Sequence, residues 1–265
     1  MSRVLVTGSS DGLGRIAAQR LVDGGHDVVL HARNDERARS AIAAVQGGRD
    51  VLVGDLSSIA QTQAVAEQAN SSGRFDAIIH NAGVGPREAG RIQTADGLAA
   101  VFAIDVLAPY LLTALIERPR RLVYLSSGMH RAGDPDLTDL QWRQRPWNGA
   151  QAYCDAKLFD VVLAFAVARN WPDVLSNAVE PGWVATKMGG PNAPADFEIG
   201  SATQVWLAVS DDPQATVSGQ YFYHQRSQES HPAASDIAIQ EGLLEACEDL
   251  TGVALPTSPK VLAGQ

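Results

Sequence analysis

The chain has 265 residues, of which 45% are hydrophobic and 19% charged, with a formal net charge of −9. This composition is typical of a globular protein with a buried core, and the acidic balance argues against nucleic-acid or anionic-membrane partners. Two cysteines, Cys154 and Cys247, make no disulfide framework and indicate a reducing, cytoplasmic setting. We expect neither a signal peptide nor a membrane span, because no apolar run approaches about 18 residues.

Short apolar segments alternate with helical patterns along the chain. Strands are predicted at 3–8, 27–33, 50–56, 75–83, 121–127, 174–182 and 219–223. Helices are predicted at 13–24, 35–46, 58–70, 95–117, 150–169, 198–209 and about 235–250. The strands are apolar almost throughout, which is typical of parallel strands covered by helices on both faces. The alternation predicts an α/β fold, a doubly wound sheet in a single domain over residues 1–265.

A glycine-rich turn, TGSSDGLG, follows the first predicted strand and contains Gly8, Gly12 and Gly14. Glycines allow a tight turn and let the backbone approach a pyrophosphate at the N-terminus of the next helix. A turn that binds nothing is the alternative, and the position between the first strand and the first helix argues against it.

The second predicted strand ends in HARN, with Ala32 where an acidic residue would bind the ribose 2′-OH of NAD(H). Arg33 follows, and an arginine there pairs with the 2′-phosphate of NADP(H). The segment favours NADP(H) and leaves NAD(H) as the alternative. Asp11 opposes a nearby phosphate if its side chain points that way, and Arg33 as a solvated loop charge is the simpler interpretation.

Two further polar segments end predicted strands. Asp55 and Leu56, in GDL, are candidates for contacts to an adenine ring, and HNAG places Asn81, Ala82 and Gly83 at the next strand end. Each could instead be an ordinary strand-end turn. Because open α/β sheets bind ligands at the carboxyl ends of their strands, all are candidate cofactor contacts.

Taken together, TGSSDGLG, HARN, GDL, HNAG, LSS, AYCDAK and PGWVAT resemble the short-chain dehydrogenase/reductase family over residues 2 to about 250. The resemblance implies a Rossmann-type sheet of about seven mainly parallel strands in a three-layer αβα sandwich. It implies NAD(P)-dependent chemistry on carbonyls and alcohols and, commonly, a homo-oligomer, either a dimer or a tetramer. The cofactor contacts that it implies are Gly8, Ser10, Asp11, Gly12, Leu13, Arg33, Asp55, Leu56, Asn81, Ala82, Gly83, Tyr153, Lys157, Pro181, Gly182, Val184 and Thr186.

The resemblance also implies the catalytic residues. Tyr153 is similar to the family's acid/base, and Lys157, one helical turn later, would lower the pKa of Tyr153 and hold the nicotinamide ribose. Ser127 would hydrogen-bond the substrate oxygen, with Ser126 as the alternative one residue earlier. Asp105 stands where many members have an asparagine that supports a proton relay, and it is either a participant in that relay or a structural replacement.

Two predicted loops bear on the substrate, at about 128–149 and 186–197. The first resembles the insertion of retinol-dehydrogenase-like members and brings Met129, His130, Trp142 and Trp147 toward the site, while Trp183 and Met188 lie in or just before the second. Apolar and aromatic residues over a pocket favour a hydrophobic or aromatic substrate. Packing of the loop onto the body is the alternative for both tryptophans, and a structural role is the alternative for His130. No cluster has metal-ligand spacing, so no metal is expected.

The sequence therefore predicts an NADP(H)-preferring oxidoreductase acting on a small carbonyl or secondary alcohol. A non-catalytic dinucleotide-binding sensor or scaffold of the same fold is the main alternative, because a fold does not determine a function. A sugar-nucleotide epimerase or enoyl reductase fits less well. Extended epimerases tend to have a different glycine spacing, and enoyl reductases a wider Tyr–Lys spacing.

Overall fold

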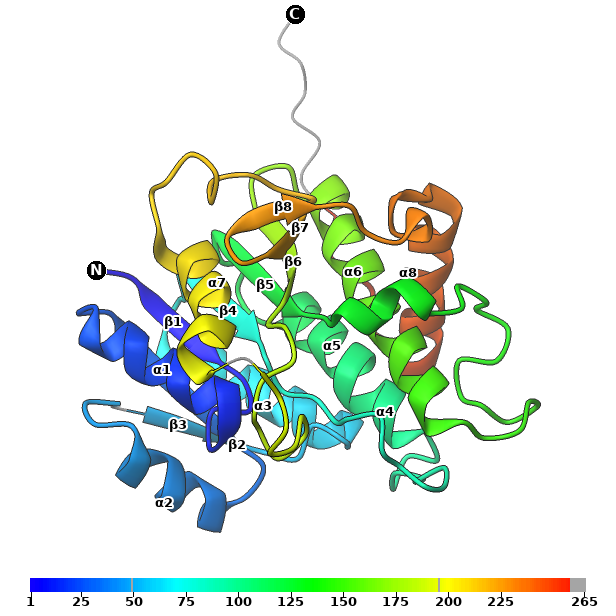
Figure 1. The fold of residues 1–265 in the computed structure, drawn as a ribbon, viewed down its shortest axis with the longest axis horizontal. Coiled ribbons are helices and arrows are strands. Elements are labelled where there is room, and N and C mark those ends of the chain that lie inside the picture. Colours follow the sequence, from blue (N-terminus) through cyan, green and yellow to red (C-terminus); the bar gives the residue numbers. More distant parts are fainter. Residues whose placement is uncertain (49, 195, 258–265) are drawn as a thin grey trace, which may run out of the picture.

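The structure, a computed structural model, describes residues 1–48, 50–194 and 196–257, so the end of the predicted single domain over 1–265 lies outside this range. An eight-stranded sheet has the order β3-β2-β1-β4-β5-β6-β7-β8, and every pairing is parallel except that of β7 with β8. The strands are β1 (Arg3–Val6), β2 (Asp27–Ala32), β3 (Asp50–Val53), β4 (Ala77–His80), β5 (Arg121–Leu125), β6 (Leu175–Glu180), β7 (Tyr221–Tyr223) and β8 (Arg226–Gln228). The predicted doubly wound α/β fold is confirmed (Figure 1).

Most helices begin at a polar residue that caps the free N–H groups of the first turn. The helices are α1 (Gly12–Asp23), α2 (Asp35–Ala44), α3 (Ile59–Ser72), α4 (Ala100–Phe102), α5 (Ala108–Leu115), α6 (Gly149–Asn170), α7 (Phe197–Val209) and α8 (Ile237–Thr251). The capping side chains are those of Asp11, Asn34, Ser58, Asn148, Asp196 and Asp236. Because these caps are local in sequence, the predicted and observed helix starts agree closely.

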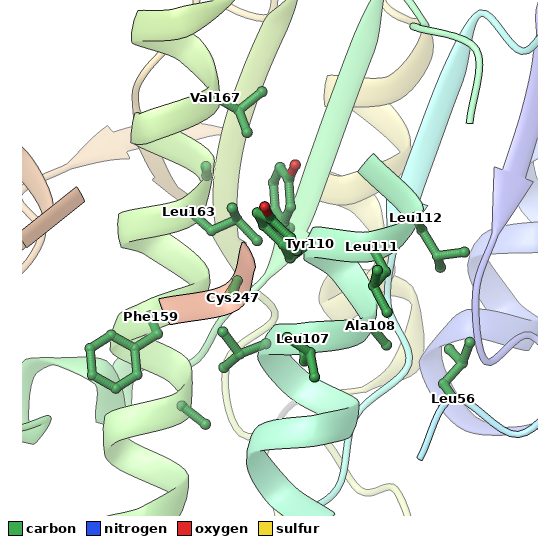
Figure 2. Close-up of a cluster of buried hydrophobic side chains, with 14 of the residues drawn as sticks. Leu56, Leu107, Ala108, Tyr110, Leu111, Leu112, Phe159, Leu163, Val167 and Cys247 are labelled. Carbon is green, nitrogen blue, oxygen red and sulfur yellow. The ribbon is translucent and has the colours of Figure 1, made fainter. Parts of the chain in front are cut away.

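The sheet separates two apolar cores. On one face the strands pack against α1, α2 and α7 through Leu21, Leu207 and their neighbours. On the other face α3, α5, α6 and α8 form the larger core, in which Tyr110, Leu163 and Cys247 meet (Figure 2). Successive residues of one strand, such as Val4 and Leu5, belong to opposite cores, which explains why the strands read as continuous apolar runs.

The predicted helix over 95–117 is shorter than expected and is interrupted by one wide turn. Residues Ala103–Leu107 form a π-helical turn between α4 and α5, in which the N–H of Ala108 bonds to the carbonyl of Ala103. Pro109 has no N–H to donate to the carbonyl four residues back, that of Asp105, so the α-helical ladder cannot continue through this turn. The wide turn places Asp105 at the centre of the molecule.

The eighth strand was not predicted. It pairs with β7 through a two-residue turn in which His224 and Gln225 have φ values of 50° and 59°. Such a turn usually carries Asn or Gly, so the sequence lacked the usual hairpin signal. In the described part of the chain no helix has the length and apolar character needed to cross a bilayer.

Candidate active site

A cavity of about 440 Å³ opens beyond the carboxyl ends of the strands, where β1 and β4 lie side by side and the strand order reverses. Ligands bind at such a switch point in open α/β sheets. Residues of its wall that the sequence predicted as cofactor contacts are Gly8, Ser10, Asp11, Gly12, Leu13, Arg33, Asp55, Leu56, Asn81, Ala82, Gly83, Tyr153, Lys157, Pro181 and Thr186. Gly182 and Val184 belong to the same segment as Pro181 but do not line the cavity.

The glycine turn is tightly fitted to the end of β4. Gly8 has a φ of +64°, and a Cβ on it would lie 2.9 Å from the Cα of Ala82. A Cβ on Gly14 would lie 2.3 Å from Nδ2 of Asn81, which donates to the carbonyl of Thr7 at 2.9 Å. Gly8 and Gly12 thus bring the backbone of the turn to the cavity wall with no side chains of their own. This cradle fits the pyrophosphate of a dinucleotide.

His31 links the glycine turn to the neighbouring strand end, and the sequence analysis missed it. Its Nδ1 accepts from the N–H of Gly8 at 3.0 Å and its Nε2 donates to the carbonyl of Gly54 at 3.0 Å. This pair of bonds requires the neutral imidazole, and burial lowers the pKa of His31 to about 4. A polar residue inside an apolar strand, at the first position of the HARN motif, was the available signal.

Four charged side chains line the cavity near the glycine turn: Asp11, Arg33, Arg37 and Lys187. Arg37 lies 3.6 Å from the Asp11 carboxylate, and Lys187 also pairs with Asp11. The hydrogen bond from Lys187, together with that from the Gly12 N–H, lowers the pKa of Asp11. Sequence reasoning named Arg33 but missed Arg37, which lies on the first turn of α2.

Tyr153 and Lys157 lie one turn apart on α6, and both line the cavity. The Lys157 ammonium nitrogen lies 5.7 Å from the centre of the Tyr153 ring. Ser126 is buried and its hydroxyl donates to the Lys157 carbonyl at 2.7 Å, so it anchors α6 to β5. Ser127 is partly exposed and, unlike Ser126, does not line the cavity, but its side chain lowers the pKa of Tyr153.

Two buried carboxylates flank Lys157. Its Nζ lies 3.1 Å from Oδ2 of Asp105 and 2.8 Å from Oδ2 of Asp160, and it donates to the carbonyl of Leu125 at 2.9 Å. Burial alone would lower the pKa of Lys157, but the two carboxylates outweigh it and raise that pKa. Asp160 was not singled out from the sequence, because a polar residue on a long helix gives no sign of the side on which its partners lie.

The pKa of Tyr153 differs from the expectation. Lys157 lowers it as expected, but burial raises it, and the carboxylates of Asp105 and Asp160 add to that increase. The net direction of the shift is upward. The sequence could not predict this outcome, because it depends on two carboxylates that only the fold brings to Lys157.

Comparisons with known proteins agree with this geometry. The family model described as short chain dehydrogenase matches residues 2–123. The protein named uncharacterized oxidoreductase AN7799, from Emericella nidulans, is 44% identical over 97% of this chain and 99% of its own. Human retinol dehydrogenase 13 is 28% identical over 96% of this chain and 86% of its own.

The chain belongs to the short-chain dehydrogenase/reductase family. Among solved structures, an uncharacterized protein from Mycobacterium paratuberculosis superposes with a TM-score of 0.82 at 24% identity, covering 97% of this chain and 95% of that one. A short-chain dehydrogenase from Burkholderia cenocepacia in complex with NADP has a TM-score of 0.66 at 20% identity, covering 84% and 95% of the two chains. Both support the fold.

In the insertion of this short-chain dehydrogenase, three of the predicted substrate residues pack onto the protein body, which was the alternative interpretation for each. His130 is buried, with Nδ1 bonded to the Ser127 carbonyl and Nε2 accepting from the N–H of His231. Trp142 is buried against Trp147, whose Nε1 donates to the carbonyl of Glu88. None of the three lines the cavity. Apolar burial and satisfied polar atoms hold them in the loop.

Three apolar residues remain candidates for substrate contact in this family member. Met188 lines the cavity, and its sulfur lies 3.9 Å from the Tyr153 hydroxyl. Met129 and Trp183 are exposed and follow Ser127 and Gly182 closely in sequence. The indole N–H of Trp183 donates to the carbonyl of Gly189, which holds the loop in a compact form.

Proposed function

We propose that the protein is an NADP(H)-preferring oxidoreductase that moves a hydride between the nicotinamide and the carbonyl or secondary alcohol carbon of a small hydrophobic substrate. The carrying observation is that Tyr153 and Lys157, one turn apart on α6, line the same cavity as the glycine turn. Membership of a dehydrogenase/reductase family supports the reaction class. The same set of residues argues against a role as a non-catalytic sensor.

In the proposed reduction, NADPH supplies the hydride. The Ser127 hydroxyl hydrogen-bonds the carbonyl oxygen, which polarises the carbonyl in the manner of an oxyanion donor. Tyr153 donates its phenolic proton to that oxygen as the carbon is reduced. Lys157 holds the ribose hydroxyls and stabilises the phenolate that Tyr153 becomes, and bulk solvent then returns the proton. Alcohol oxidation uses the same residues in reverse.

The preference for NADP(H) rests on the adenosine end of the cavity. Ala32 offers no acceptor for a ribose 2′-OH, while Arg33 and Arg37 bring two cations to the same wall. Two guanidinium groups suit a phosphate better than a hydroxyl. Solved family members of similar fold have been crystallised with NADPH or NADP, which is consistent with this preference.

The substrate is proposed to be apolar near its reacting carbon. Val84, Ile104 and Met188 line the cavity wall, and the relatives include a protein named retinol dehydrogenase 13. Since Met188 lies against the Tyr153 hydroxyl, an entering carbonyl takes the place of its thioether. A thioether is flexible enough to move aside and repack against the substrate.

Replacing Tyr153 with Phe tests the reaction. We expect turnover of lipophilic ketones and aldehydes to fall at least about 1,000-fold, because the proton donor is lost. NADPH binding, measured by nicotinamide fluorescence, should stay within about twofold, because the phenyl ring is retained. Full activity in this variant would show that Tyr153 is not the acid, and binding without turnover by the wild type would favour the sensor.

Replacing Arg33 or Arg37 with Ala tests the cofactor preference. We expect each change to raise the KM for NADPH about tenfold or more, because a charge-assisted bond to phosphate contributes roughly 1.5–3 kcal/mol. The KM for NADH should change little. Arg39→Ala, an exposed arginine on the same helix, is the matched control. Equal use of NADH and NADPH by the wild type would contradict the assignment.

A further inference from the structure

The catalytic lysine sits in a buried cluster with more carboxylates than ammonium groups. Lys157 contacts Asp105 from the π-helical turn and Asp160 from its own helix, one turn further on. The side chains of the three residues are between 0% and 6% exposed, so water screens the cluster very little. Burial raises the pKa of both carboxyl groups, that of Asp160 to about 7. Once both are ionised, at alkaline pH, one ammonium cannot neutralise two carboxylates, and any further negative charge nearby is opposed.

The hydrogen bonds identify Asp160 as the firmer partner of the lysine. Lys157 donates to Oδ2 of Asp160 and to the Leu125 carbonyl. Asp105 accepts instead from the N–H of Val84, and its Oδ2, although buried and close to Lys157, accepts no hydrogen bond. Asp160 thus fixes the position of the Lys157 ammonium, and Asp105 adds negative charge from the π-helical turn.

The other titratable groups around the cluster come from three elements. Tyr153 precedes Lys157 on α6, Tyr124 faces Asp160 from β5, and Glu88 interacts with Asp105 from the loop after β4. Apart from Lys157, each of these groups is neutral or negative. Among the residues that the structure describes, these surroundings therefore supply no second cation to offset a Tyr153 phenolate.

We propose that Asp160 is a positioning residue that acts through Lys157: it holds the ammonium in place and, with Asp105, offsets its charge, so that Tyr153 is kept in its proton-donating form. This inference rests on the proposed acid/base role of Tyr153. It implies that carbonyl reduction, which needs the phenol, operates over a wide pH range. Alcohol oxidation, which needs the phenolate, is confined to alkaline pH.

Asp160→Asn separates charge from position. The amide oxygen of Asn still accepts from Lys157, whereas the negative charge is gone. The phenolate absorbance of Tyr153 is isolated as the difference between each protein and its Tyr153→Phe counterpart. We expect the Tyr153 phenolate to form about one pH unit lower in Asp160→Asn than in the wild type, because a nearby like charge has been removed.

Asp155→Asn is the matched control. Asp155 is a buried carboxylate on the same helix, but it accepts from Arg145 at 2.7 Å and from the N–H of Asp134 at 2.9 Å. The Tyr153 phenolate titration of Asp155→Asn should coincide with that of the wild type. Coincident titrations of Asp160→Asn and the wild type would overturn the inference. If Asp160→Asn does not fold, Asp105→Asn must shift the titration in the same direction, and an unshifted curve there overturns it too.

The titration needs no substrate, so a failure of this inference can be distinguished from a failure of the proposed function. An unshifted titration with normal turnover refutes the role of Asp160 alone. A shifted titration supports that role even where no carbonyl is turned over, an outcome that counts only against the proposed reaction. With turnover, the alkaline limb of kcat/KM for alcohol oxidation should move with the phenolate titration in Asp160→Asn, and it should not move in Asp155→Asn.

Discussion

At the scale of single residues, the polar groups buried in this chain matter more than its surface charges. His31 joins the glycine turn to the end of β3 as a neutral imidazole. Asp160 bonds to Lys157 inside the molecule. Because a buried polar atom must find a partner, each of these side chains fixes the geometry of the groups that it contacts. The glycine turn and helix α6 are both held in this way.

His31 makes the stability of the protein sensitive to acid. Its folded pKa of about 4 lies below the unfolded value of 6.5, so the unfolded chain binds the extra proton first as pH falls. Stability contributed by the neutral form is present above pH 6.5 and is lost as the pH falls toward 4. The unfolding free energy of the wild type should fall as the pH drops from about 6.5 to 4.5. In His31→Asn this fall should be smaller by about 2 kcal/mol.

Denaturant unfolding at the two pH values measures this effect, and the difference between pH values is the readout rather than the absolute stability. The exposed His224 provides the control, since His224→Asn changes the same ionisable group at the surface. An acid dependence in His31→Asn equal to that of the wild type would show that the imidazole is not held neutral.

At the scale of elements, the junction of β1, α1 and β4 positions the site. The N–H and side-chain amide of Asn81 both bond to Thr7, and Gly14 at the start of α1 packs directly on that amide. The three glycines were visible in the sequence, but their contacts were not. Gly14 is required by close packing against another element, and Gly8 by both close packing and a positive φ.

Gly14→Ala should therefore destabilise the junction. The added Cβ would lie 2.3 Å from Nδ2 of Asn81 and 2.6 Å from the carbonyl oxygen of Gly8, so the strand ends must separate. We expect a loss of about 2 kcal/mol in unfolding free energy and weaker NADPH binding. Gly90→Ala, where a Cβ would meet no atom within 4 Å, is the control and should change neither quantity. Wild-type binding by Gly14→Ala would contradict the fit.

At the scale of the whole molecule, the C-terminal segment closes one side of the sandwich. Helix α8 packs on α6, and the chain after it is held by the Tyr110 hydroxyl, which donates to the Val253 carbonyl, and by the Trp171 indole, which donates to the Pro256 carbonyl. In Figure 1, α8 lies along the outer side of α6 and α5. A homo-oligomer of this chain would have to use surfaces other than the α5–α6 face that α8 covers.

Leu243→Ala tests this closure. Leu243 is fully buried between α8 and the larger core, so its truncation should cost about 2–5 kcal/mol of unfolding free energy. Loosening α8 exposes the apolar face of α5 and α6, and we expect light scattering to show increased self-association. Leu244→Ala, at a partly buried neighbour on the same helix, should show a smaller loss and no association. Equal effects in the two variants would argue against α8 as a cover.

The sequence by itself determined the fold class, the order of strands and helices, and most of the cavity wall. These features depend on local signals: apolar periodicity, glycine positions, helix caps and motifs at strand ends. The hairpin strand β8 was missed because His224 and Gln225 adopt positive φ without the usual Asn or Gly. The sequence left open whether His130 and Trp142 face the site or pack onto the body, because an aromatic side chain in a loop packs inward or outward according to neighbours that are distant in sequence.

The tertiary structure alone decided the electrostatics of the site. Asp105 lies more than fifty residues before Lys157 in the chain and comes from a different element, and only the π-helical turn before Pro109 and the packing of α6 bring the two within 3.1 Å. Arg37 and Lys187 both pair with Asp11, likewise because the fold brings together residues that are distant in sequence. The interaction of charges depends on distance and burial, and neither quantity is encoded in the spacing of residues along the sequence.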